Sequence, residues 1–101
     1  MNQQQYDEVV KILESDCKTT YVLKRRSGNT CAVGALLEAT TEPAFVGQVR
    51  PTEAQFVALQ ERFGLVRIVV LSMMGINDSV RRSRAQRQKK VIECVPLPEV
   101  E

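Results

Sequence analysis

The sequence is organised around one short apolar segment, Cys31-Ala32-Val33-Gly34-Ala35-Leu36-Leu37-Glu38-Ala39. Apolar residues occupy nearly every position, and a helix that is apolar around its whole circumference belongs in a protein core. The small residues Ala32, Gly34 and Ala35 let a neighbouring backbone approach closely. Thr30 precedes the segment, and its hydroxyl is well placed to cap the first turn. The segment therefore predicts a short, buried central helix capped by Thr30.

Upstream of this core helix, an amphipathic pattern predicts a first helix from Tyr6 to about Ser15. Its apolar residues recur at the spacing of one helix face, at Tyr6, Val9, Val10 and Leu13. A short β-branched run and a charged turn with a glycine then lead into the core helix. We interpret this connection as an extended segment or a short β-arm near residues 19–26.

Downstream, helix signals follow a loop of about ten residues that ends at Arg50. Thr52 and Gln55 have the spacing of a capping box and predict the start of a third helix, which Gly64 ends. Residues 65–74 are ambiguous, because their β-branched side chains favour a strand while their length favours a helix, and we assign a helix. A last helix is predicted over residues 83–95. Pro96 and Pro98 follow it and forbid its continuation.

These patterns predict a mainly α fold, a compact bundle of about five short helices in a single domain over residues 1–101. A chain of 101 residues has room for one core, and its 44% hydrophobic and 26% charged residues are typical of a globular protein. We expect the polar N-terminal residues 1–4 and the proline-rich tail, residues 96–101, to be flexible.

The composition excludes several classes of function. The chain has no histidine, so it cannot form a Ser-His-Asp triad or a Cys-His pair. Its three dispersed cysteines, Cys17, Cys31 and Cys94, cannot by themselves complete a four-ligand structural zinc site. Their odd number and wide spacing favour reduced thiols in a cytoplasm. We expect no metal, no cofactor, no signal peptide and no membrane span.

A basic segment near the C-terminus is the strongest candidate for a binding surface. It has six cations and no anion in ten residues, whereas the rest of the chain has eight cations and twelve anions. On a helix, Arg84, Arg87 and Val91 share one face, and such a face suits an acidic protein surface or a phosphate backbone. A solvated helix face without a partner is the simplest interpretation. The candidate partner-binding residues are Arg81, Arg82, Arg84, Arg87, Lys89 and Lys90.

Two further features are candidate chemical sites. Cys31 lies at the first turn of the core helix, where the helix dipole would lower a thiol pKa. Its apolar neighbours and the absence of a base instead favour a buried, structural thiol. Asn77-Asp78 follows an apolar segment and is interpreted as a turn whose short polar side chains cap helix ends. A cysteine-dependent enzyme is therefore the weakest functional hypothesis.

Three short motifs together resemble a group of short phage and bacterial helical proteins. The motifs are Cys31 to Leu37, Arg62-Phe63-Gly64-Leu65, and Asn77-Asp78 with a closing helix. That group carries a Cys-Ala-x-Gly-Ala-Leu helix, a Phe-Gly-Leu junction and a later Asn-Asp turn. The resemblance spans about Asn29 to Val95 and implies a compact helical fold in a bacterial or mobile-element setting, with no catalytic residue. The chain departs from the group in its basic last helix, where the group more often has acidic residues.

We therefore expect a small non-enzymatic binding protein of phage or bacterial origin. It would act as an inhibitor or adaptor, or as a component of host defence, by occupying the acidic surface of a partner protein. The alternative is a nucleic-acid-binding regulator that uses the basic helix at residues 81–90. No aromatic residue lies near enough in sequence to stack on bases, which favours the protein partner.

Overall fold

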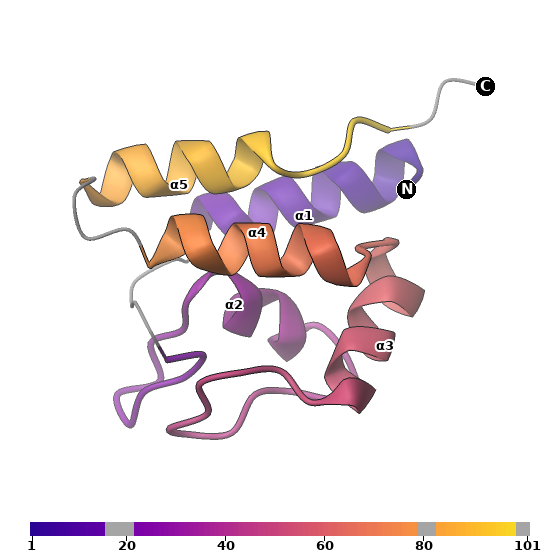
Figure 1. Ribbon diagram of the computed structural model, residues 1–101. Coiled ribbons are helices and arrows are strands. Elements are labelled where there is room, and N and C mark those ends of the chain that lie inside the picture. Colours follow the sequence, from indigo (N-terminus) through magenta and orange to yellow (C-terminus); the bar gives the residue numbers. More distant parts are fainter. Residues whose placement is uncertain (16–21, 79–82, 99–101) are drawn as a thin grey trace.

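The computed structural model describes residues 1–15, 22–78 and 83–98, which form five helices (Figure 1). The helices are α1 (Gln3–Ser15), α2 (Ala32–Glu38), α3 (Glu53–Phe63), α4 (Arg67–Asn77) and α5 (Arg84–Glu93). The mainly α bundle of about five short helices is confirmed. Of the β-arm expected near residues 19–26, the described part contains one isolated antiparallel bridge between Lys24 and Thr30. Residues 19–21 lie outside the described residues.

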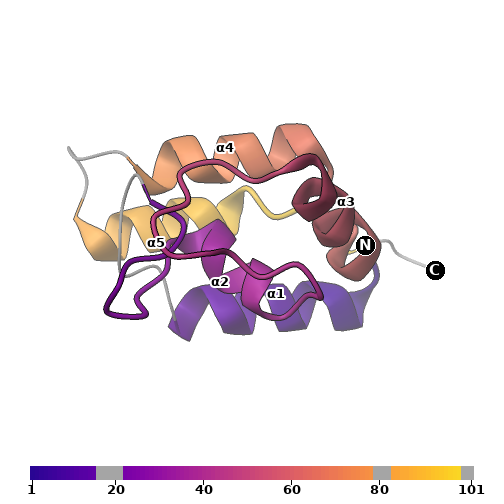
Figure 2. The same cartoon turned by 90° about the horizontal axis from the view of Figure 1, so that it is seen from below.

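Helix α2 lies in the middle of the molecule, as its apolar sequence predicts. Its residues from Ala32 to Leu37 are all buried. Helices α1, α4 and α5 run roughly alongside one another, and α3 stands across one end of the bundle (Figure 1). Seen from below, α1 and α4 form two opposite sides of the molecule, with α2 and α5 between them (Figure 2). One continuous core joins all five helices to the segment before α2.

The start of α2 differs from the prediction, because Cys31 and not Thr30 is the capping residue. The Cys31 backbone is extended, and its Sγ accepts a hydrogen bond from the Gly34 N–H at 3.5 Å. Thr30 is buried and pairs with Lys24 in the bridge, so its backbone continues the preceding segment. The Leu23 carbonyl accepts the Cys31 N–H at 3.3 Å and lies directly over α2, where a Cβ on Gly34 would collide with it. Glycine at this position permits the close approach.

Helix α1 begins at Gln3, three residues before the predicted start. The Asn2 side chain accepts a hydrogen bond from the Gln5 N–H at 2.8 Å, and the Gln5 side chain accepts one from the Asn2 N–H at 2.9 Å. This reciprocal pair satisfies two amides at the helix end. Met1 packs against the core. Residues 1–4, where we expected flexibility, therefore contain the start of a helix. Residues 96–98 of the tail are not helical.

Helices α3 and α4 follow the predicted local signals. The Thr52 hydroxyl accepts the Gln55 N–H at 3.2 Å and the Gln55 side chain accepts the Thr52 N–H at 2.9 Å, so the capping box is confirmed. Gly64 ends α3 in the left-handed conformation, with φ of 73°. The helical assignment of residues 65–74 is confirmed from Arg67 onward. The residues that α4 buries recur at helical spacing, at Val70, Met73 and Asn77.

A buried pair of amides organises the loop between α2 and α3. The side chains of Gln48 and Gln55 exchange hydrogen bonds, and the one from Gln55 Nε2 to Gln48 Oε1 measures 3.1 Å. The same two amide groups donate to the carbonyls of Arg50 at 2.7 Å and Pro43 at 3.2 Å. The pair therefore ties the loop to the first turn of α3. Neither glutamine has a sequence context that predicts its burial.

Candidate partner-binding surface

Helix α5 carries the described part of the basic segment. Its start is fixed by a capping box, in which Ser83 accepts the Gln86 N–H at 3.2 Å and Gln86 accepts the Ser83 N–H at 3.1 Å. The helix predicted over residues 83–95 is thus observed, in the shorter form Arg84–Glu93. Arg81 and Arg82 of the predicted partner-binding set lie outside the described residues.

Two side chains fix the rotation of α5 about its own axis. Val91 is fully buried in the core, at 0% exposure. Gln88 Nε2 donates to the carbonyls of Leu13 at 2.8 Å and Glu14 at 2.7 Å, at the end of α1. Both carbonyls belong to the last turn of α1. The face of α5 that bears Val91 and Gln88 is therefore its packing face.

The row Arg84, Arg87 and Val91 does not form an outward cationic stripe. Because Val91 belongs to the core, the residue one turn before it, Arg87, is only half-exposed. Arg84 is exposed because it lies in the first turn, beyond the packed part of the helix. Packing turns the later part of this face, at Arg87 and Val91, toward the core and leaves Arg84 in solvent.

The cations that reach solvent on α5 are Arg84, Lys89 and Lys90. Lys90 Nζ lies 3.3 Å from a carboxylate oxygen of Glu93, and both side chains are about half-exposed. An exposed ion pair of this spacing contributes only about 0.3–0.5 kcal/mol, so a partner carboxylate can displace it at little cost. The described part of α5 has four cations against one anion, which leaves a local excess of positive charge.

Cys31 is buried, as predicted, and its surroundings oppose reactivity. The residue is 4% exposed, and burial raises the pKa of its thiol above the ordinary value, while the hydrogen bond from the Gly34 N–H lowers it to a smaller extent. A raised pKa keeps the thiol protonated at neutral pH, and the thiolate is the nucleophilic form. Cys94 is half-buried, and Cys17 lies outside the described residues.

Asn77 and Asp78 lie at the junction between α4 and the turn that follows it. Asn77 is the last residue of the helix and is 1% exposed. Its Oδ1 accepts the N–H of Ala32, the first residue of α2, at 3.4 Å, and its Nδ2 donates to the Asp78 carboxylate at 3.3 Å. The capping role predicted for these short polar side chains is confirmed, and Asn77 exerts it on a helix far away in the sequence.

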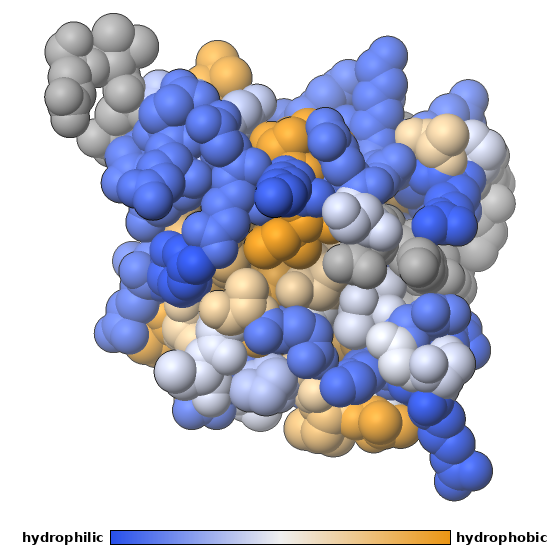
Figure 3. Space-filling view, turned by 180° about the vertical axis from the view of Figure 1, so that it is seen from behind, coloured by the Kyte–Doolittle hydropathy of each residue, from blue (hydrophilic) through white to orange (hydrophobic). Residues whose placement is uncertain are grey.

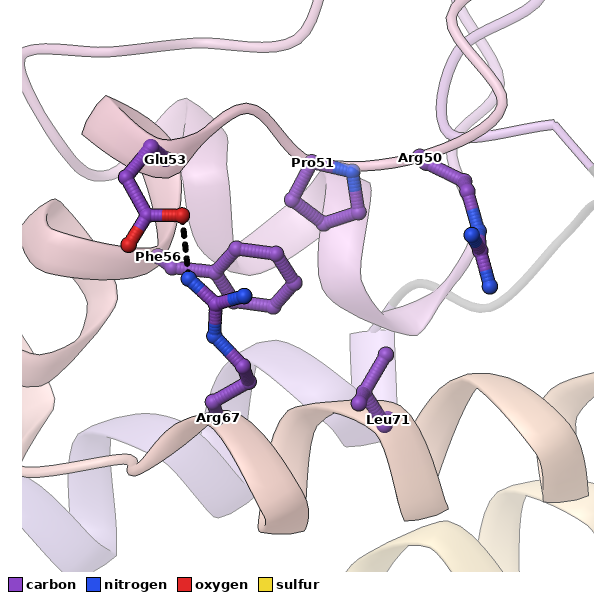
Figure 4. Close-up of a pocket in the computed structure, with 6 residues that line it drawn as sticks. All are labelled: Arg50, Pro51, Glu53, Phe56, Arg67 and Leu71. Carbon is purple, nitrogen blue, oxygen red and sulfur yellow. Dashed lines mark hydrogen bonds and ion pairs between the residues drawn. The ribbon is translucent and has the colours of Figure 1, made fainter.

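Two adjoining hollows border α4, and together we call them the α4 groove. The first has a volume of about 270 Å³ and is lined by Arg50, Pro51, Glu53, Phe56, Arg67 and Leu71 (Figure 4). The second, about 460 Å³, shares Arg50 and Leu71 and continues to Val49, Met74, Gly75 and Asp78. No motif predicted the groove, because its lining comes from segments that only folding brings together.

Arg67 closes one end of the α4 groove. Its guanidinium carbon lies 4.4 Å from the centre of the Phe56 ring, and the same group pairs with the Glu53 carboxylate (Figure 4). The charge of Arg67 is thereby shared between an aromatic face and a carboxylate of the same chain. On the opposite side of the molecule, hydrophilic residues surround a hydrophobic area at the centre of the view, and further hydrophobic residues show at the edges (Figure 3).

Within residues 1–15, 22–78 and 83–98, no group of three or more potential ligand side chains is arranged to hold a metal ion. Over the same ranges, every helix is too short or too polar to cross a membrane. In comparisons with known proteins, no family model, no curated protein and no solved structure matches the chain.

Proposed function

We propose that the chain is a small non-enzymatic binding protein, of phage or bacterial origin, that occupies an acidic surface of a partner protein and so acts as an inhibitor or adaptor. The observation that carries the proposal is the exposure of Arg84, Lys89 and Lys90 on a helix that Val91 and Gln88 attach to the rest of the molecule. Arg81 and Arg82 precede this helix in the sequence and extend its positive charge.

Electrostatic steering is the proposed mechanism. A local excess of positive charge raises the rate of encounter with an acidic surface and suppresses binding to other partners. Arg84 can bind a carboxylate with two parallel hydrogen bonds, whereas Lys89 and Lys90 act as point charges. Because α5 is fixed to the core through its other face, binding costs little backbone conformational entropy, and the main entropic cost is the rotamer freedom of the lysine and arginine side chains.

Nucleic-acid binding is the alternative, and it would use the same cations on phosphates. The described part of α5 bears no aromatic side chain for bases to stack on, which favours the protein partner. The alternative also makes a different prediction. The purified chain would bind nucleic acid in the absence of any partner protein.

The first experiment compares charge reversal on α5 with charge reversal elsewhere. The double variant Arg84→Glu/Lys89→Glu changes two exposed cations of α5, and the control Lys11→Glu/Arg26→Glu changes two exposed cations outside it. Both variants alter the net charge by the same amount. We expect wild type and control to capture the same protein from a nuclease-treated bacterial lysate at about 0.05 M salt. The α5 variant should fail to do so, and all capture should weaken at about 0.5 M salt, where the Debye length is shorter.

Equal capture by both variants would contradict the proposed surface. A parallel assay measures binding of the purified protein to labelled duplex and single-stranded DNA at two salt concentrations. Two results together would replace the proposal with the nucleic-acid alternative. In the first, wild type binds DNA at low salt and the α5 variant does not. In the second, nuclease treatment of the lysate abolishes capture.

A further inference from the structure

Helix α4 exposes an apolar stripe on its solvent side. The stripe consists of Ile68, Leu71, Ser72 and Gly75, at the spacing i, i+3, i+4, i+7 of one helix face. Ile68 is 73% exposed and Leu71 is 43% exposed. Figure 2 shows α4 along the outer edge of the molecule, with nothing of the described chain outside it. Two large apolar side chains, Ile68 and Leu71, are thus exposed one turn apart beside two small residues, an arrangement suited to contact with another helix.

Gly75 is a glycine that the fold of a single chain does not explain. Gly34 is required by the close approach of the Leu23 carbonyl, and a positive φ accounts for Gly28, Gly47 and Gly64. At Gly75 the backbone has no positive φ, and an added Cβ would meet nothing within 4 Å. Glycine inside a helix costs about 0.5–1 kcal/mol relative to alanine. A side chain that reaches Gly75 from outside the chain would account for the missing Cβ.

The order of side chains along the stripe makes it complementary to its own copy. The two larger residues, Ile68 and Leu71, come first, and the two smaller ones, Ser72 and Gly75, follow. If two copies of α4 pack antiparallel about a two-fold axis between residues 71 and 72, Ile68 lies against Gly75 of the second copy. Leu71 then lies against Ser72 of the second copy. A parallel arrangement would instead place the large residues against each other.

The charges at the two ends of α4 favour the same arrangement. Arg67 is the first residue of α4, Asp78 follows its last residue, and both line the α4 groove on one flank of the stripe. In an antiparallel pair, Arg67 of each copy, which also pairs with Glu53 of its own chain, comes near Asp78 of the other copy, and the helix dipoles oppose each other. A parallel pair would instead align the two helix dipoles, which is less favourable.

We propose that the outer face of α4 binds a second copy of this chain, forming a symmetric antiparallel dimer. Such an interface is isologous, because the same residues serve on both sides. The stripe and the exposed cations Arg84, Lys89 and Lys90 of α5 are different surfaces. Dimerisation and partner binding can therefore succeed or fail independently of each other.

A swap of side-chain size tests the dimer. The variant Gly75→Ile places a large side chain where Ile68 of the second copy would lie, and the double variant Ile68→Ala/Gly75→Ile exchanges large and small positions. Ala54→Ile is the matched control, since it adds the same side chain at an exposed position of α3. The measurement is sedimentation equilibrium over a wide range of protein concentration, with circular dichroism to verify folding.

We expect wild type and Ala54→Ile to dimerise and Gly75→Ile to weaken association by about tenfold or more. The double variant should regain dimerisation, because the new isoleucine at position 75 then lies against the new alanine at position 68 of the second copy. A wild-type chain that stays monomeric at every concentration would overturn the proposal. A Gly75→Ile variant that dimerises as well as wild type would also overturn the proposal. In both cases the circular dichroism spectrum verifies that the protein is folded.

Discussion

Gly34 and Gly75 both lie inside helices, yet their surroundings differ completely. A Cβ at position 34 would collide with the Leu23 carbonyl, whereas a Cβ at position 75 would meet open space. The first glycine is therefore required by packing within the chain. The second lowers helix stability without any steric benefit inside one chain.

Alanine substitution should change the free energy of unfolding in opposite directions at these two glycines. Gly34→Ala forces the backbone around Leu23 to shift, and we expect it to lower the free energy of unfolding by about 1–3 kcal/mol. Gly75→Ala should raise that free energy by about 0.5–1 kcal/mol. Urea denaturation at low protein concentration measures both, and each variant is the control for the other. An increase at position 34 would contradict the close approach of the Leu23 carbonyl, and a decrease at position 75 would contradict the open space around Gly75.

The buried thiol of Cys31 provides a second prediction at the scale of one residue. Burial raises its pKa in the folded state, so the folded protein holds the thiol proton more tightly than the unfolded chain does. The resulting contribution to stability is complete below the pKa of a free thiol, about 8.5, and is lost as the pH rises above that value. At neutral pH, iodoacetamide should label Cys31 far more slowly than free cysteine, and denaturant should abolish the protection.

Peptide mapping by mass spectrometry after timed labelling distinguishes Cys31 from the other two cysteines. Labelling of native Cys31 at the rate of free cysteine or faster would contradict its burial and would revive the hypothesis of a cysteine-dependent enzyme.

Among the structural elements, the loop between α2 and α3 depends on two residues. Gln48 and Gln55 are buried and satisfy each other, and Gln55 also takes part in the capping box of α3. Removal of one partner leaves the other buried amide short of hydrogen bonds, which costs about 1–3 kcal/mol. The loop is therefore held by this polar contact together with the packing of Ala44 in the core.

The variant Gln55→Ala should lower the free energy of unfolding by about 1–3 kcal/mol. Gln60→Ala, at an exposed position of the same helix, is the matched control and should change it by less than about 0.5 kcal/mol. Thermal or urea denaturation of both variants gives the comparison. Equal stability of the two would show that the amide pair contributes nothing.

Across the whole molecule, the two proposed surfaces belong to neighbouring helices. Helix α5 lies along α4 (Figure 1), and each turns one face to the core and another to solvent. A dimer through α4 would carry two copies of α5, and a partner with two acidic sites would then bind more tightly through both. The core needs both helices, because α4 contributes Met73 and α5 contributes Val91.

The helices themselves follow from local sequence. The capping box of Thr52 and Gln55, the left-handed Gly64 and the buried apolar α2 were all predicted, because each rests on contacts within one or two helical turns. Even the ambiguous residues 65–74 contained the helical spacing of their buried side chains. The choice between strand and helix there was settled by packing against the rest of the core.

The binding surface and the caps that join helices depend on partners that are distant in the sequence. Gln88 bonds to Leu13 across 75 positions and Asn77 bonds to Ala32 across 45 positions. The sequence alone determined that a basic helix exists near the C-terminus. Only the tertiary structure decided which cations face solvent, because the rotation of a helix is set by the core side chains it buries.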